Sequence, residues 1–139
     1  MGDNPDSIDG YVESCLQALP AHFRVAVIGS TDFWHPASAG RCLEIGSALA
    51  ALSGVLLLTG GMPAVGEAIG RGFHATRLAS RAPPDVFHLL PEDADWHWDY
   101  GLTLSAGRDM HERREVLGRV GEVFVCVEGG PGTEHEARV

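Results

Sequence analysis

The residues best suited to chemistry lie in a glycine-rich segment near the end of the sequence. An apolar run over residues 123–127 is followed by Glu128 and then by Gly129-Gly130-Pro131-Gly132-Thr133-Glu134-His135-Glu136. The apolar run is typical of a strand that is covered on both faces of a sheet. The glycines permit a tight turn, and Thr133 can cap a helix that begins just after it. Backbone N–H groups at such a turn can bind a phosphate without a basic side chain, although a plain strand-to-helix turn is the alternative.

Two earlier glycine-containing turns follow apolar runs in the same way. Gly29-Ser30 comes after residues 23–28, and Gly60-Gly61 comes after residues 55–58. Because the carboxyl ends of parallel strands share one edge of a sheet, the three segments are predicted to converge there. This convergence favours a phosphate or nucleotide site over three unrelated turns. The predicted binding residues are Gly29, Ser30, Gly60, Gly61, Gly129, Gly130, Gly132 and Thr133.

The order of apolar runs and helical patterns predicts an α/β fold, a three-layer Rossmann-like parallel sheet with helices on both faces. Predicted helices cover residues 11–19, 37–52, 64–73 and 109–119, and predicted strands cover residues 23–28, 55–58, 85–90, 102–105 and 123–127. Residues 77–84 are predicted to form a loop, and residues 1–10 a flexible leader. The aromatic segment Trp96-His97-Trp98-Asp99-Tyr100 is either a lid over a ligand base or a packing patch, and the packing patch is favoured.

Composition limits the possible functions of the chain. Its 139 residues, of which 45% are hydrophobic, are expected to form a single nucleotide-binding domain over residues 1–139. The net charge of -9 excludes a general nucleic-acid binder, because no basic run is present to neutralise a phosphate backbone. The longest apolar run, Val55 to Leu58, is too short to cross a membrane. Three cysteines without paired spacing indicate reduced thiols in a cytoplasmic protein.

A metal site is not expected. His111 opens a helical segment that is similar at first sight to a metalloprotease motif, but Glu115 stands where the second histidine would be needed. The other histidines have no ligand spacing. The charged segment from Asp109 to Glu115 is otherwise typical of a solvated helix face.

Two motifs together resemble the LOG (Lonely Guy) family, also called "lysine decarboxylase-like" proteins. Met110-His111-Glu112-Arg113, followed by the glycine segment 129–136, is similar to the family pattern M-H-E-R and then P-G-G-x-G-T-x-x-E. The resemblance covers most of residues 23–136. It implies a nucleoside 5'-monophosphate phosphoribohydrolase, which cleaves the N-glycosidic bond to give free base and ribose 5-phosphate. It also implies a homodimer that binds a small-molecule nucleotide and needs no cofactor.

The same resemblance assigns the catalytic roles to Arg113 and Glu136, and phosphate binding to the glycine segment. Cleavage at C1' of ribose builds positive charge on the sugar. A carboxylate such as Glu136 can stabilise that charge and orient or deprotonate the attacking water. Arg113 is always protonated, so it can position the phosphate or Glu136 but cannot act as a base.

The sequence departs from the family pattern at three places. Glu128 stands where the family has proline, Met62-Pro63 replaces the third glycine of the second segment, and the chain stops at Val139, where family members continue. We therefore expect the C-terminal elements of the fold to be missing. The alternative function is a non-catalytic carrier or sensor that binds a nucleotide or molybdenum cofactor (a pterin phosphate). A third interpretation treats the glycine segments as turns only.

Overall fold

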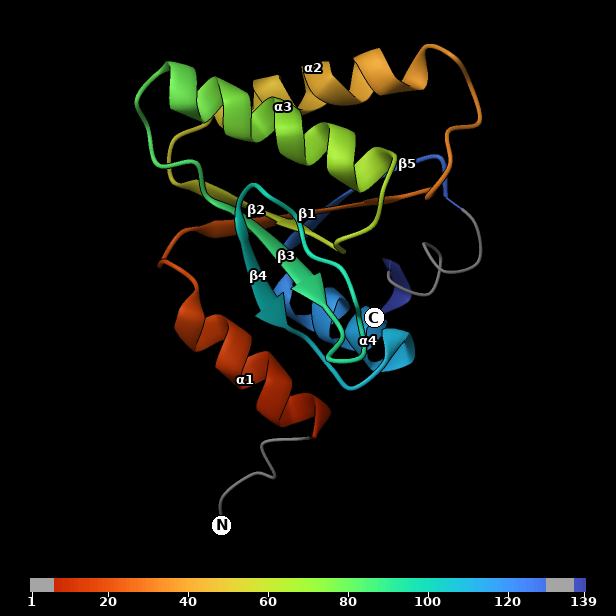
Figure 1. Cartoon of the computed structure of the whole chain (residues 1–139). Helices are drawn as coiled ribbons and strands as arrows, with labels where there is room; N and C mark the ends of the chain where they lie inside the picture. Colours follow the sequence, from red (N-terminus) through yellow and green to blue (C-terminus); the bar gives the residue numbers. More distant parts are fainter. Residues whose placement is uncertain (1–6, 130–136) are drawn as a thin grey trace.

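The computed structural model describes residues 7–129 and 137–139 and shows a parallel sheet between two layers of helices (Figure 1). Neighbouring strands pair in parallel in the order β4-β3-β2-β1-β5, so the predicted α/β, Rossmann-like class is confirmed. The strands are β1 (Phe23–Gly29), β2 (Val55–Thr59), β3 (Val86–Leu90), β4 (Leu102–Ser105) and β5 (Val123–Val127). The helices are α1 (Ile8–Ala18), α2 (Ser38–Ala50), α3 (Val65–Ala79) and α4 (Met110–Val120).

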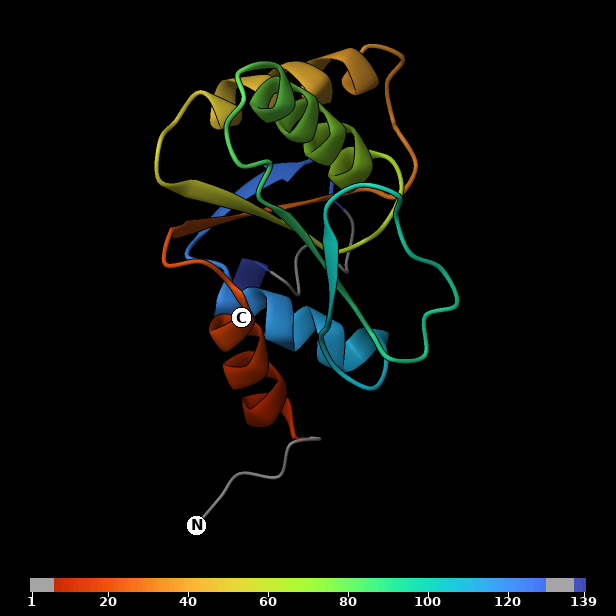
Figure 2. The same ribbon diagram turned by 60° about the vertical axis from the view of Figure 1, so that its left-hand side comes forward.

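Side chains of each central strand alternate between two hydrophobic cores. In β1, Val25 and Val27 pack in the core beneath α2 and α3, whereas Ala26 and Ile28 pack in the core beside α1 and α4. This period of two is the geometry of an extended strand. Because helices cover both faces (Figure 2), both sets of side chains are buried, which explains why the central strands are continuous apolar runs.

Helices α1 and α3 are longer than predicted, whereas α2 is slightly shorter. Helix α1 begins at Ile8, with the Ser7 side chain accepting a hydrogen bond from the Gly10 amide at 3.0 Å, so residues 8–10 are not part of a leader. Helix α3 continues to Ala79, through the start of the predicted loop. Arg77 explains this extension, because its buried guanidinium donates to the carbonyls of Ala50, Leu52, Val55 and Pro83. Those bonds satisfy the buried charge of Arg77, which the prediction of a loop over residues 77–84 did not include.

Strand β5 is less buried than predicted. It pairs with β1 and is the outermost strand of the described part of the sheet. Its residues are intermediate or exposed, and Val123 is 43% exposed. The prediction of a strand covered on both faces was therefore wrong for β5. The apolar composition of this strand does not reveal that it lies at the edge of the described sheet.

Helices α2 and α3 cross with their backbones almost in contact. A Cβ at Gly46 would overlap the Ile69 carbonyl of α3, and one at Gly72 would overlap the Leu43 carbonyl of α2. Only glycine permits this approach, so these helical glycines are explained by close packing. No described helix has the length and apolar character needed to span a bilayer.

Candidate functional site

Three loops meet at the carboxyl edge of the sheet. We call them the first loop (residues 30–37, after β1), the second loop (residues 60–64, after β2) and the third loop (after β5, of which residues 128 and 129 are described). The Val65 amide donates to the Ser30 carbonyl at 3.3 Å, and a Cβ at Gly29 would overlap both Val65 and the Val127 carbonyl. Since β1 lies between β2 and β5, this is where the strand order reverses, the usual ligand position in such sheets.

The second loop is held by a buried chain of hydrogen bonds. His88 is 1% exposed, and its Nε2 lies 2.9 Å from the Tyr100 carbonyl, which can only accept, so Nε2 carries the proton. Nδ1 therefore accepts from the Thr59 hydroxyl at 2.6 Å. The Thr59 oxygen in turn accepts from the Gly61 amide at 3.1 Å. A neutral histidine thus fixes the turn at Gly61, whose φ of 72° lies in the region that glycine favours.

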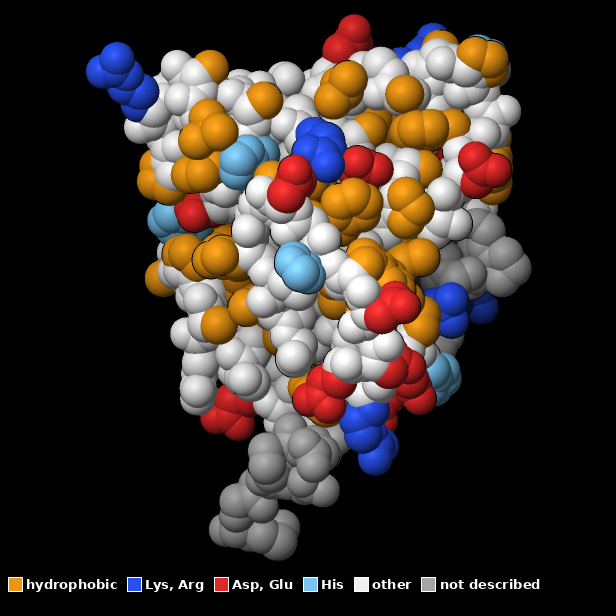
Figure 3. Space-filling model, in the orientation of Figure 1, with side chains coloured by type: hydrophobic (Ala, Val, Ile, Leu, Met, Phe, Trp, Pro, Cys, Tyr) orange, Lys and Arg blue, Asp and Glu red, His pale blue; other side chains and the backbone are white. Residues whose placement is uncertain are grey.

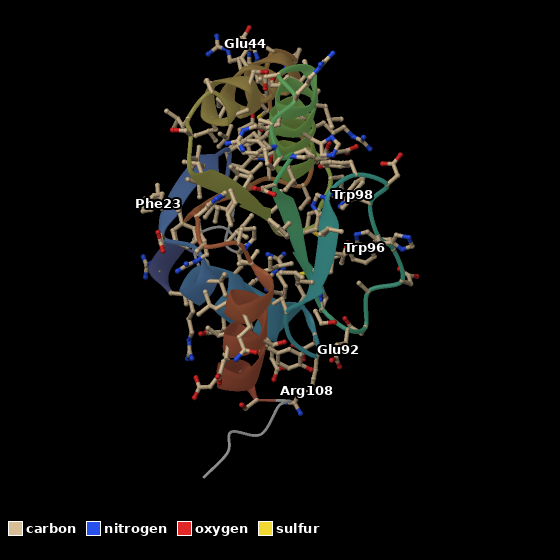
Figure 4. The ribbon with its side chains drawn as sticks, turned by 90° about the vertical axis from the view of Figure 1, so that its left-hand side faces the viewer. Phe23, Glu44, Glu92, Trp96, Trp98 and Arg108 are labelled. Carbon is tan, nitrogen blue, oxygen red and sulfur yellow. The ribbon has the colours of Figure 1, made fainter. Side chains whose placement is uncertain are left out.

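The aromatic segment of the β3–β4 loop packs onto the same turn. The indole N–H groups of Trp96 and Trp98 both donate to the Gly61 carbonyl, at 2.9 and 3.0 Å. The two side chains lie close together beside the sheet (Figure 4). Trp98 and Tyr100 also contact the His88 ring. The segment therefore serves as a packing patch that fixes the second loop.

Arg113 of α4 lies directly against the second loop. Its side chain is 4% exposed, and its Nε and one terminal nitrogen donate to the Met110 sulfur at 3.2 and 2.9 Å. A Cβ on Gly60 would lie 2.5 Å from the other terminal nitrogen, so glycine is needed for the guanidinium to reach this position. The structure thus brings the predicted catalytic arginine to a predicted binding loop, although 53 positions separate Gly60 from Arg113 in the sequence.

Glu128 of the third loop binds to the first loop. Its Oε1 accepts from the Ser30 hydroxyl at 3.1 Å and from the Trp34 amide at 2.7 Å, and its Oε2 accepts from the Ser38 hydroxyl. The Ser38 hydrogen bond is the largest cause that lowers the pKa of Glu128, followed by the bond from the Trp34 amide. The carboxylate is therefore ionised at neutral pH. It lies at the N-terminal end of α2, where negative charge is stabilised.

The predicted site residues fall into two groups. Gly29, Ser30, Gly60, Gly61 and Arg113 come together at the carboxyl edge, and Gly129 is exposed next to Glu128. The remaining predicted residues lie outside the described part of the chain: Gly130, Gly132, Thr133 and Glu136.

Sequence reasoning missed three contributors to this edge. Glu128 was regarded only as a departure from a pattern, and the Thr59–His88 pair was not identified. A polar residue inside the apolar run 86–90 was the available signal for His88, because a buried imidazole needs hydrogen-bond partners. In the part of the chain that the structure describes, His, Cys, Asp and Glu side chains form no group of three that could hold a metal ion.

The buried His88 predicts a loss of stability in acid. Burial lowers the pKa of His88 from 6.5 to about 4, and the charges of Arg71 and His74 add to this effect. The unfolded chain therefore binds a proton at a higher pH than the folded chain does. The stability that the neutral ring provides is complete above pH 6.5 and is lost as the pH falls toward 4. The free energy of unfolding should fall by roughly 3 kcal/mol from this group across that range.

Urea unfolding at several pH values measures this effect. Carboxylates titrate in the same range, so the test is the difference in unfolding free energy between the wild type and His88→Gln at each pH. That difference should change as the pH falls from 6.5 toward 4. Parallel pH curves for the two proteins would contradict a neutral buried His88.

Charged groups on the surface are mixed in sign. On the face shown in Figure 3, Arg side chains stand among acidic ones rather than in a single basic patch, and the sequence contains no lysine. Exposed pairs such as Arg119–Asp9 at 2.6 Å contribute to this pattern. Among the described residues, the donors at the carboxyl edge include the Trp34 amide, the hydroxyls of Ser30 and Ser38 and the guanidinium of Arg113.

Comparisons with known proteins agree with this geometry. The model of the SLOG cluster4 family matches residues 22–139. A cytokinin riboside 5'-monophosphate phosphoribohydrolase of Rhodococcoides fascians is 37% identical over 54 residues, which are 38% of this chain and 25% of that protein. The chain thus matches about a quarter of that relative's length. These matches confirm the predicted resemblance to LOG-like proteins.

Solved structures show the same fold. The X-ray structure of TM1055 superposes with a TM-score of 0.65 and 27% identity, covering 84% of this chain and 66% of that one. DNA processing protein A from Helicobacter pylori, described for its single-stranded DNA binding mode, has a TM-score of 0.61 and 20% identity. That match covers 85% of this chain and 60% of the other. At this identity the second likeness shows the fold alone.

Proposed function

The chain belongs to the SLOG cluster4 family, and from this premise we propose that it acts as a nucleoside 5'-monophosphate phosphoribohydrolase. The reaction is hydrolysis of the N-glycosidic bond to give free base and ribose 5-phosphate. The match to a phosphoribohydrolase supports this proposal. We also propose a cytoplasmic homodimer whose ligand is a small-molecule nucleotide rather than a nucleic acid, in keeping with the net charge of -9.

The proposed chemistry assigns different tasks to two residues. Backbone amides of the glycine loops hold the 5'-phosphate, and Arg113 positions the phosphate or the Glu136 carboxylate. Glu136 stabilises the oxocarbenium-like charge at C1' and orients or deprotonates the attacking water. Water attacks C1' as the bond to the base breaks, and the base leaves with a proton.

The observation that carries the proposal is the position of Arg113. A guanidinium that is 4% exposed has lost most of its contact with water, which costs free energy unless fixed partners compensate. Its position against Gly60 places a permanent positive charge beside a loop suited to an anion. A purely structural arginine, such as Arg77, instead donates to carbonyls at the opposite end of the strands.

Release of free base from AMP, followed by chromatography, tests the proposal. Glu136→Gln keeps the size of the side chain but removes its charge, so base release should fall by about 100-fold or more while AMP binding persists. Glu134→Gln, two residues earlier, is the matched control and should keep most of the activity. Equal activity in the wild type and Glu136→Gln, or no base release by the wild type, would refute the hydrolase.

One observation favours a second candidate, a non-catalytic carrier or sensor for a nucleotide or pterin phosphate. Glu128 occupies donors of the first loop, which indicates a ligand arrangement different from a loop open to phosphate. Calorimetric titration with AMP distinguishes the two functions. Tight binding without release of base supports the carrier, and turnover supports the hydrolase.

A further inference from the structure

Three hydrogen-bond donors converge on the carboxylate of Glu128. They are the hydroxyls of Ser30 and Ser38 and the backbone amide of Trp34, and all belong to the first loop or to the first turn of α2. Donors of this kind, at the start of a helix, are the usual partners of a phosphate oxygen. Here the carboxylate of Glu128 accepts these hydrogen bonds instead of a phosphate.

The backbone at Glu128 is also unusual. Its φ of 50° lies in the left-handed region, which a non-glycine residue adopts only at a cost. The hydrogen bonds from the first loop compensate for this cost, and they connect residues at least 90 positions apart in the sequence. The carboxylate is thus fixed by side chains and backbone from another loop, rather than extending freely into solvent.

The location gives Glu128 influence over a ligand. Ser30 follows Gly29, which packs against Val65 just after the second loop, and Glu128 of the third loop accepts a hydrogen bond from the Ser30 hydroxyl. Burial raises the pKa of the Cys42 thiol in α2, and the negative charge of Glu128 raises this pKa further. A fixed negative charge at this point repels a phosphate and attracts groups that donate hydrogen bonds.

We propose that Glu128 determines ligand specificity at this edge: its carboxylate fills the donor cluster of the first loop and directs the ligand's phosphate away from that loop. The inference rests on the proposed function in taking a sugar phosphate as the ligand. A sugar hydroxyl is the group favoured beside Glu128, because Oε2 accepts one described hydrogen bond and has capacity for a second.

Calorimetric titration of the full chain with ribose 5-phosphate, ribose and inorganic phosphate tests the inference. None of these ligands contains the bond that the enzyme is proposed to cleave, so the result does not depend on turnover. In Glu128→Ala the three donors become available, and affinity for ribose 5-phosphate and inorganic phosphate should rise by about tenfold or more. Affinity for ribose should not rise.

Two further variants make the result specific. Glu44→Ala removes an exposed carboxylate of α2, labelled in Figure 4, and controls for the change in net charge. Glu128→Gln keeps the shape of the side chain without its charge and should give an intermediate gain, which also covers the case in which Glu128→Ala does not fold. Any of three results would overturn the inference. They are unchanged or weaker phosphate affinity in folded Glu128 variants, an equal gain in Glu44→Ala, and no binding of phosphate by any variant.

Discussion

Replacing Arg113 by alanine is expected to lower base release from AMP by about 100-fold or more, because a positioned charge beside the reacting ligand is lost. The guanidinium lies against Gly60 in a water-poor position, where its interaction with an anion is stronger than in solvent. The measurement is kcat and KM for base release, with thermal unfolding to confirm that the variant folds.

A matched arginine on the same helix provides the control. Arg119 of α4 pairs with Asp9 at the surface, and Arg119→Ala should keep nearly full activity. Arg113→Lys retains the charge but not the planar fork, so it should recover only part of the rate. If folded Arg113→Ala protein releases base as fast as Arg119→Ala, then Arg113 has no role in the reaction.

Gly46→Ala is expected to destabilise the fold strongly. A Cβ at this position meets the Ile69 carbonyl and lies 2.7 Å from the Phe73 amide, so the two helices must separate. Overpacking of backbone against backbone costs on the order of 3 kcal/mol, which exceeds the gain of about 1 kcal/mol in helix propensity. Urea unfolding monitored by circular dichroism measures the net loss.

Gly40→Ala on the same helix isolates the effect of packing. A Cβ there meets nothing within 4 Å, so only the gain in helix propensity remains and the variant should be slightly more stable than the wild type. Opposite signs for the two substitutions support the close crossing of α2 and α3. A Gly46→Ala protein as stable as Gly40→Ala would contradict it.

Most of the fold could be predicted from local patterns. Strands β1, β2 and β3 are apolar runs because helices cover both faces, and such runs are recognisable in a sequence. The position of β5 could not be predicted in this way, since strand order is set by packing between distant segments. The extension of α3 to Ala79 depends on Arg77 reaching carbonyls of another loop, which no local pattern shows.

The loops of the candidate site could be predicted from the sequence, but the contacts that hold these loops in place could not. Glycines after apolar runs identified the first and second loops, because turns of this kind have a composition of their own. The Thr59–His88 pair, the two indoles on Gly61 and the donors around Glu128 link residues from separate strands and loops. Such contacts exist only once the chain has folded, so single residues give little sign of them.

A crystal structure of the Glu136→Gln protein with bound AMP is the most direct measurement. We expect the phosphate on backbone amides of the glycine loops, residue 136 beside C1' of the ribose, and Arg113 within hydrogen-bond distance of the phosphate or of residue 136. AMP bound away from the carboxyl edge of the sheet, or bound there with residue 136 directed into solvent, would contradict the proposed hydrolase.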